Sequence, residues 1–178
     1  TLAKFYRVSG QSTQHQGVLP DVAFPSIIDT KEIGESALPE AMPWDTIRPA
    51  IKPAVDPFKP YIDKLKAEHE ARVAKDAEFI FIRDKLALAK KLMAEKTVSL
   101  NEAERRAQHA DIDAKQLVME NARRQAKGEA PLKEMKKEDE DALPVEPEKT
   151  KPEDDAYLSE TGRVLLDYLK LSSQVAKK

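Results

Sequence analysis

The chain has 178 residues, of which 40% are hydrophobic, 35% are charged and only 6% are aromatic. Its net charge of −2 argues against a dedicated nucleic-acid-binding protein, because such proteins usually carry a basic surplus. The absence of cysteine excludes disulfides and thiolate chemistry, and no apolar run approaches the roughly 20 residues that cross a bilayer.

Residues 1–24 predict a short β-hairpin. Residues 4–8 are rich in strand-forming side chains, Gly10 breaks the strand, and residues 18–24 form a second extended piece that Pro20 confines to a sheet edge. A two-stranded hairpin is not stable alone, so we expect it to complete the sheet of a longer protein. Without the rest of that sheet, three outcomes stay open for residues 1–22: disorder, pairing of the exposed edge with a second copy of the chain, or folding onto the helices.

Residues 25–57 predict an irregular segment that wraps over a neighbouring surface. Prolines recur too closely for a long helix; those from this segment to the next helix are Pro25, Pro39, Pro43, Pro49, Pro53, Pro57 and Pro60. The single tryptophan, Trp44, lies among them. We interpret it as a buried anchor rather than a ligand contact, because a large amphipathic ring gains most from packing.

Residues 58–128 change to a helical period and predict three helices. Asp56 before Pro57 is a suitable start for the first, and Asp76 for the second. The second helix is apolar over more than half its circumference and is expected to form the centre of a bundle; its main stripe is Phe79, Ile82, Leu86, Ala89 and Met93.

The third helix is predicted to start at a capping box in residues 99–102, Ser-Leu-Asn-Glu, and to stop at Gly128. Its expected buried stripe is alanine-rich and contains Ala103, Ala107, Ala110, Ala114, Leu117 and Val118. Alanine lets helices approach closely but buries little area.

Residues 129–154 form an acidic, proline-containing linker, and residues 155–178 predict a final amphipathic helix that packs on the helical domain. The expected buried stripe of that helix is Tyr157, Leu158, Thr161, Val164, Leu165, Tyr168, Leu169 and Ser172. Gly162 costs helix stability, so we expect it to mark close contact with another helix.

No side chain qualifies as a catalytic, cofactor-binding or metal-binding residue, and no cofactor is predicted. His15, His69 and His109 lack metal-ligand spacing, and His69 falls on or beside the first helical stripe, where packing is the simpler interpretation. Ser9 and Ser12 have the neighbours of turn formers rather than of an activated nucleophile.

Several runs together resemble the tail-specific proteases, the carboxy-terminal processing serine peptidases. The N-terminal runs are residues 4–8, Lys-Phe-Tyr-Arg-Val, 10–14, Gly-Gln-Ser-Thr-Gln, and 17–22, Gly-Val-Leu-Pro-Asp-Val. Further matches are 33–35, 37–38, 42–47, 68–79, 98–101 and 155–161, so the similarity extends over the whole chain and is weakest in the acidic linker.

The resemblance implies a periplasmic endopeptidase that recognises apolar C-terminal tails through a PDZ domain and cleaves with a serine nucleophile, a lysine base and an assisting glutamine. In that family all three precede the strand corresponding to residues 1–8. The chain is therefore expected to be a non-catalytic C-terminal part, with a structural or docking role and a helical-repeat lipoprotein adaptor as a possible partner.

The predicted fold is mainly α: a bundle-like helical C-terminal domain with a short N-terminal β-hairpin left over from the protease core. An alternative from a different class stays open, namely a self-standing helical interaction or scaffold protein with a β-hairpin arm. Such a protein would need further strands to protect the hairpin edge.

Overall fold

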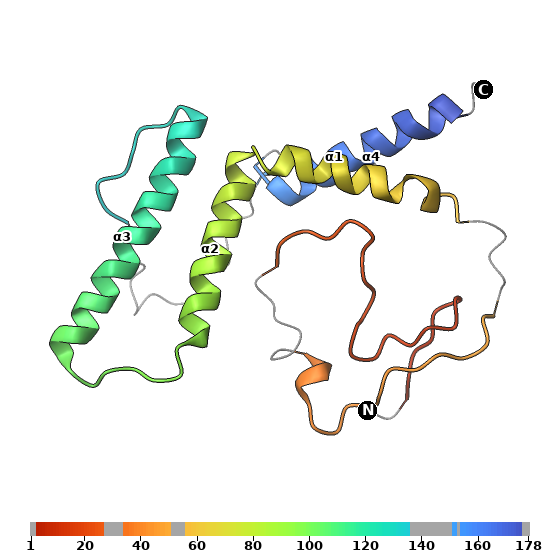
Figure 1. Ribbon diagram of the computed structural model, residues 1–178, viewed down its shortest axis with the longest axis horizontal. Helices are drawn as coiled ribbons and strands as arrows, with labels where there is room; N and C mark the ends of the chain where they lie inside the picture. The colour runs from red at the N-terminus through yellow and green to blue at the C-terminus, as the bar shows by residue number, and fades with distance from the viewer. Residues whose placement is uncertain (1–2, 27–33, 51–55, 136–150, 153, 176–178) are drawn as a thin grey trace. The chain divides into compact units, whose positions relative to one another are not determined.

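The computed structural model describes residues 3–26, 34–50, 56–135, 151–152 and 154–175 (Figure 1). The α-helices in these residues are α1 (Ile62–Val73), α2 (Ala77–Ala94), α3 (Glu102–Lys127) and α4 (Ala156–Val175), with short 3₁₀ turns η1 (Glu35–Ala37) and η2 (Lys59–Tyr61). The mainly helical class is confirmed. The chain divides into two compact units, Thr1–Lys66 and Ala67–Lys178, which we describe separately.

In the first unit the predicted hairpin between residues 4–8 and 18–24 is wrong. The chain instead reverses tightly, with Gly10 N donating to Arg7 O at 2.8 Å. Isolated antiparallel bridges then join Tyr6 to Ser12 and Gln11 to Thr46. Gly10 makes this possible, because its φ is +83° and an added Cβ would lie 2.1 Å from the Ile47 carbonyl oxygen.

Polar contacts hold the proline-rich segment to the N-terminal turn. Tyr6 donates its hydroxyl hydrogen to Asp45 at 3.2 Å, and Lys4 donates to the Pro43 carbonyl at 2.6 Å. Trp44 stays 40% exposed, so the prediction that it is a buried anchor is wrong for the described chain. The parts of residues 25–57 that fall on 27–33 and 51–55 lie outside the described residues.

The helix ends of the second unit follow the sequence closely at two of three predicted positions. Asp76 caps α2 by accepting from the backbone N–H groups of Glu78 and Phe79 at 3.0 and 3.3 Å. Gly128 ends α3 in the left-handed conformation with φ of 75°. Both predictions are confirmed.

The predicted capping box of α3 is wrong by two residues. Asn101 is the N-cap and accepts from Ala103 N at 2.9 Å, while Ser99 lies before the helix and accepts from Asn101 N at 3.1 Å. Asparagine and serine are equally good N-caps, so the residue directly before the first helical turn takes the role.

Helices α2 and α3 lie side by side as an antiparallel hairpin (Figure 1). Among the described residues of α2 only Phe79 is buried, so the prediction that this helix is the centre of a bundle is wrong. The expected alanine stripe of α3 is also exposed rather than buried, at Ala103, Ala107, Ala110 and Ala114.

Helix α4 packs through a face that coincides with the predicted stripe only in part, at Val164, Tyr168 and Ser172. Its inward positions are Glu160 and Leu171, 0% and 9% exposed, with Val164 and Asp167 half-buried between them. Leu158, Leu165 and Leu169 are 52%, 57% and 51% exposed.

Nothing lies within 4 Å of a Cβ built on Gly162, so the predicted close helix contact at that glycine is wrong for the described residues. In the part of the chain that the structure describes, no helix is both long and apolar enough to span a membrane.

Candidate functional site

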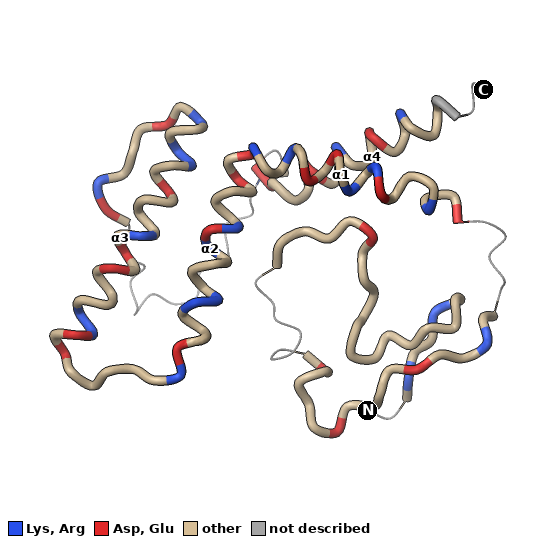
Figure 2. Tube along the Cα trace, viewed as in Figure 1, with Lys and Arg blue, Asp and Glu red and all other residues tan. Residues whose placement is uncertain are grey.

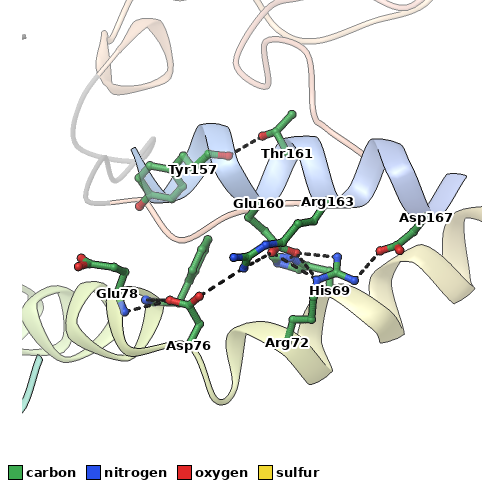
Figure 3. Close-up of polar contacts among 10 residues, drawn as sticks. His69, Arg72, Asp76, Glu78, Tyr157, Glu160, Thr161, Arg163 and Asp167 are labelled. Atoms are coloured by element: carbon green, nitrogen blue, oxygen red, sulfur yellow. Dashed lines mark hydrogen bonds and ion pairs between the residues drawn. The ribbon is translucent and has the colours of Figure 1, made fainter. Parts of the chain in front are cut away.

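The most deeply buried polar side chains of the second unit gather where α4 meets the end of α1 and the start of α2 (Figure 3). Glu160 of α4 is 0% exposed and His69 of α1 is 5% exposed. Buried carboxylates are rare unless they are paired, so this cluster is the strongest candidate for a specific role. We call it the Glu160 cluster; its other members are Arg72, Asp76, Arg163 and Asp167.

Two side chains of α1 bind the carboxylate of Glu160. Its Oε1 lies 2.9 Å from His69 Nδ1 and 2.8 Å from Arg72 Nη2, and Arg72 Nε donates to Oε1 at 3.1 Å and to Oε2 at 3.4 Å. Residues 69 and 72 are three apart on α1, so their side chains lie on the same helix face. This spacing brings the imidazole of His69 and the guanidinium of Arg72 to one carboxylate.

The remaining ion pairs extend the cluster to the N-terminal end of α2. Arg72 also pairs with Asp167, which lies on the same face of α4 about two turns after Glu160. Arg163 lies 3.4 Å from Asp76 and 3.6 Å from Glu160 Oε2. Because Asp76 is the N-cap of α2, the same carboxylate starts one helix and pairs with another.

Aromatic rings close the apolar side of the cluster. Phe79 is 1% exposed, and its ring lies edge-to-face with His69 at 6.0 Å and with Tyr157 at 5.8 Å between centroids. Edge-to-face pairs of this kind stabilise beyond simple burial. The rings therefore shield the buried ion pairs of Glu160 from solvent on this side.

The electrostatics favour the ionised carboxylate. Burial alone would raise the pKa of Glu160, but hydrogen bonds from Arg72 and His69 outweigh it and hold the pKa below its ordinary value of 4.5. Hydrogen bonding to Glu160 in turn raises the pKa of Arg72. A carboxylate stabilised in this way is a poor general acid or base near neutral pH, so we interpret the cluster as structural.

A second, more exposed cluster joins α2 to the C-terminal end of α3. Glu120, 8% exposed, accepts from Arg123 at 2.7 Å and from Arg124 at 2.9 Å, and Arg123 reaches Glu78 of α2 at 2.9 Å. Hydrogen bonds from Arg123, followed by those from Arg124, lower the pKa of Glu120 against the effect of its burial. Arg123 also lies over the ring of Phe81 at 5.2 Å.

The three histidines lie in unrelated surroundings. His15 occupies a turn with φ of 59°, His69 belongs to the Glu160 cluster, and His109 lies on the exposed surface of α3 near Arg105. Within the described ranges no group of three potential metal ligands comes together. Ser12 is buried and accepts from Gln14 N at 3.0 Å, in keeping with its interpretation as a turn former.

Sequence reasoning missed Glu160 although a signal was present. Residues 160, 164, 167 and 171 recur at helical spacing and define the inward face of α4. Because two of the four are acidic, apolar periodicity predicts instead that the leucines of α4 face inward. The complementary signal is the His69 and Arg72 pair on the apolar side of α1.

Comparison with known proteins adds the family. Residues 28–170 match the family described as the C-terminal domain of tail specific protease. The chain belongs to this family. The matched range contains the whole Glu160 cluster, so the cluster is a feature of this tail-specific protease C-terminal domain.

A relative from Haemophilus influenzae (strain ATCC 51907 / DSM 11121 / KW20 / Rd), named tail-specific protease, is 36% identical over 177 residues. The alignment covers 97% of this chain and 24% of the relative. The chain thus spans about a quarter of the length of that curated protein, and the resemblance inferred from the sequence is confirmed.

Proposed function

We propose that this chain is the non-catalytic C-terminal domain of a periplasmic serine endopeptidase that degrades or processes proteins from their apolar C-terminal tails. The observation that carries the proposal is the family match over residues 28–170, together with a relative of about four times the chain's length. The nucleophilic serine, the lysine base and the assisting glutamine would belong to the rest of the parent protein, as would the PDZ domain.

The role we propose for the domain itself is structural support and docking. The Glu160 cluster fixes α4 against α1 and the start of α2 through charged contacts with defined geometry, whereas exposed leucines on α4 leave surface for other parts of the assembly. A helical partner such as a helical-repeat lipoprotein adaptor suits the helical surface of the second unit. Self-pairing through a hairpin edge has less support, since the described residues contain isolated bridges rather than a strand edge.

The absence of catalysis is tested on the chain itself. Incubated with a peptide that ends in apolar residues, the purified chain should release no product. Cleavage that persists through repeated purification, and that a serine-directed inhibitor blocks, would contradict the proposal.

The supporting role is tested in the parent protein. Glu160→Ala, made in the full-length protease, should reduce cleavage of the same peptide because the domain loses its fixed α4. Glu102→Ala is the matched control, since its carboxylate is 78% exposed and, among the described residues, pairs with Arg106 of the same helix. Equal activity of both variants would contradict the supporting role of the domain. The periplasmic location is tested separately: osmotic shock should release the parent protein from cells.

A further inference from the structure

Helix α4 has few apolar anchors. Among its described residues only one apolar side chain, Leu171, is buried, and Leu158, Leu165 and Leu169 are more than half exposed. In the part of the chain that the structure describes, α2 and α3 are the only helix pair whose backbones come close at many positions. Both signs of charge occur along α1 and along α4 (Figure 2). The attachment of α4 therefore depends on the Glu160 cluster.

The charged groups around Glu160 come from every helix that packs there. They are His69 and Arg72 of α1, Asp76 at the start of α2, and Arg163 and Asp167 of α4 itself, with the phenol of Tyr157 beside them (Figure 3). Three carboxyl groups thus face two guanidinium groups and one imidazole. Acid neutralises the carboxylates and removes no positive charge, because arginine stays protonated. Side chains that attract one another at neutral pH would then repel.

Glu160 is the carboxyl group on which this balance depends most. Its side chain is 1% exposed, and its Oε1 lies within 3.1 Å of one nitrogen of His69 and two of Arg72. Loss of its charge would leave Arg72 with Asp167 as its remaining carboxylate. Breaking a buried pair in this way is far more costly than breaking an exposed one, because water cannot replace the lost partner.

Glu160 takes up a proton only in acid. Burial opposes ionisation, but hydrogen bonds from Arg72 and His69 outweigh it and hold the pKa of Glu160 below its ordinary value of 4.5. The carboxylate is therefore charged at neutral pH. The ion pairs that it makes with α1 are lost as pH falls through the folded pKa.

The chain connectivity allows α4 to leave without opening the α2–α3 hairpin. Residues 128–155 join α3 to α4, and a connection of that length spans up to about 90 Å when it is extended. The hairpin also has ion pairs of its own, since Arg123 of α3 binds Glu78 of α2 as well as Glu120. None of these three residues belongs to the Glu160 cluster.

We propose that the Glu160 cluster is a charge-dependent latch, which holds α4 against α1 while Glu160 is ionised and releases α4 when that carboxylate takes up a proton. The α2–α3 hairpin stays folded in the released state. Release exposes Phe79, which is 1% exposed in the closed state and packs on Tyr157 of α4. The latch deepens the supporting role proposed for the cluster. It does not depend on catalysis by the parent, so labelling of the chain tests the latch and cleavage by the full-length protease tests the supporting role.

The test labels single cysteines in the full chain, which has none of its own. Leu171→Cys places a thiol on the inward face of α4, where the native side chain is 9% exposed, and Leu165→Cys places one on the outward face, where it is 57% exposed. A dipyridyl disulfide reacts with thiols in acid as well as at neutral pH, so the ratio of the two rates reports closure of α4. At neutral pH Leu171→Cys should react at least about tenfold more slowly than Leu165→Cys, and well below pH 4.5 the two rates should agree within about twofold.

A second substitution assigns the release to Glu160. Glu160→Gln removes the charge and keeps the size of the side chain, so in the Leu171→Cys chain it should raise the labelling rate at neutral pH by about tenfold or more and remove most of the pH dependence. Glu102→Gln is the matched control, since that carboxylate is 78% exposed, and it should change the rate by less than about twofold.

Amide hydrogen exchange checks the result without any cysteine. In the Glu160→Gln chain at neutral pH, peptides from α4 should lose protection relative to the unsubstituted chain, while peptides from α2 and α3 keep theirs. This measurement separates release of one helix from unfolding of the whole unit.

Three outcomes would overturn the proposal. Slow labelling of Leu171→Cys together with Glu160→Gln would show that apolar contacts alone hold α4. Loss of amide protection in α2 and α3 along with α4 would show unfolding of the whole unit instead of release of one helix. Equal labelling of Leu171→Cys and Leu165→Cys at neutral pH would show that no closed state exists.

Discussion

The α1–α4 contact and the α2–α3 hairpin use similar side chains in opposite ways. At the first contact charge lies inside, with Glu160 and His69 only 0% and 5% exposed, while leucines of α4 face outward. At the second, the ion pairs around Arg123 lie at one end of the hairpin with side chains about a quarter exposed, and apolar lining stays open in a groove between the two helices. Both contacts leave apolar surface uncovered.

This difference shows that the burial of an ion pair determines how much the loss of one partner lowers the free energy of unfolding. A buried carboxylate that loses its cations, or cations that lose their carboxylate, leave uncompensated charge in a medium of low polarity. Water solvates the same charges when they are exposed. Removing one partner should therefore damage the α1–α4 contact more than the α2–α3 hairpin, and four experiments can break or sharpen that statement.

The largest effect is expected from Glu160→Ala. It removes the acceptor shared by His69 and Arg72 and should lower the free energy of unfolding by about 3–5 kcal/mol, as measured by urea denaturation. Glu102→Ala, whose carboxylate is 78% exposed, should cost less than about 0.5 kcal/mol. A small effect at Glu160 would mean that water enters the cluster.

The same carboxylate should make stability depend on pH. Because its folded pKa lies below the ordinary value of 4.5, the folded protein binds fewer protons than the unfolded chain. The stabilisation is complete above that ordinary value and is lost as pH falls through the folded pKa. Melting temperatures measured from neutral to acidic pH should fall more steeply for the parent chain than for Glu160→Gln; parallel curves would contradict the assignment.

Arg123→Ala should have an intermediate effect. It leaves Glu120, 8% exposed, with Arg124 as its remaining cation and removes the link to Glu78 of α2. We expect a loss of about 1.5–3 kcal/mol, the range for a hydrogen bond to a charged group, by the same denaturation assay. Arg106→Ala, whose side chain is 79% exposed, serves as control. Equal losses of stability in both variants would show that the partly buried ion pairs of Arg123 contribute no more than an exposed surface pair.

The smallest effect, and the only stabilising one, is expected from Gly162→Ala. The position lies inside α4, and open space surrounds a Cβ built there. Alanine should therefore raise stability by up to about 1 kcal/mol through its higher helix propensity. Repeating the measurement in the longer parent sharpens the result, since destabilisation there alone would place another segment against this face.

Local signals in the sequence located two helix ends correctly. Asp76 and Gly128 were predictable because a cap or stop depends on a few neighbouring residues and their backbone geometry. The hairpin failed because two extended pieces do not choose their partners locally. The pairing of Gln11 with Thr46 and the close approach of Gly10 to Ile47 join residues far apart in the chain.

The sequence by itself determined the helical class, the positions of α2 and α3 and the membership of the tail-specific protease C-terminal domain family, because these follow from composition, short-range capping and similarity. Only the tertiary structure decided which face of α4 turns inward. Apolar periodicity favoured the leucine stripe, but His69 and Arg72 on α1 satisfy the Glu160 carboxylate so fully that the charged face packs instead. These hydrogen bonds join groups that are 88 and 91 residues apart in the sequence, so no local sequence pattern predicts them.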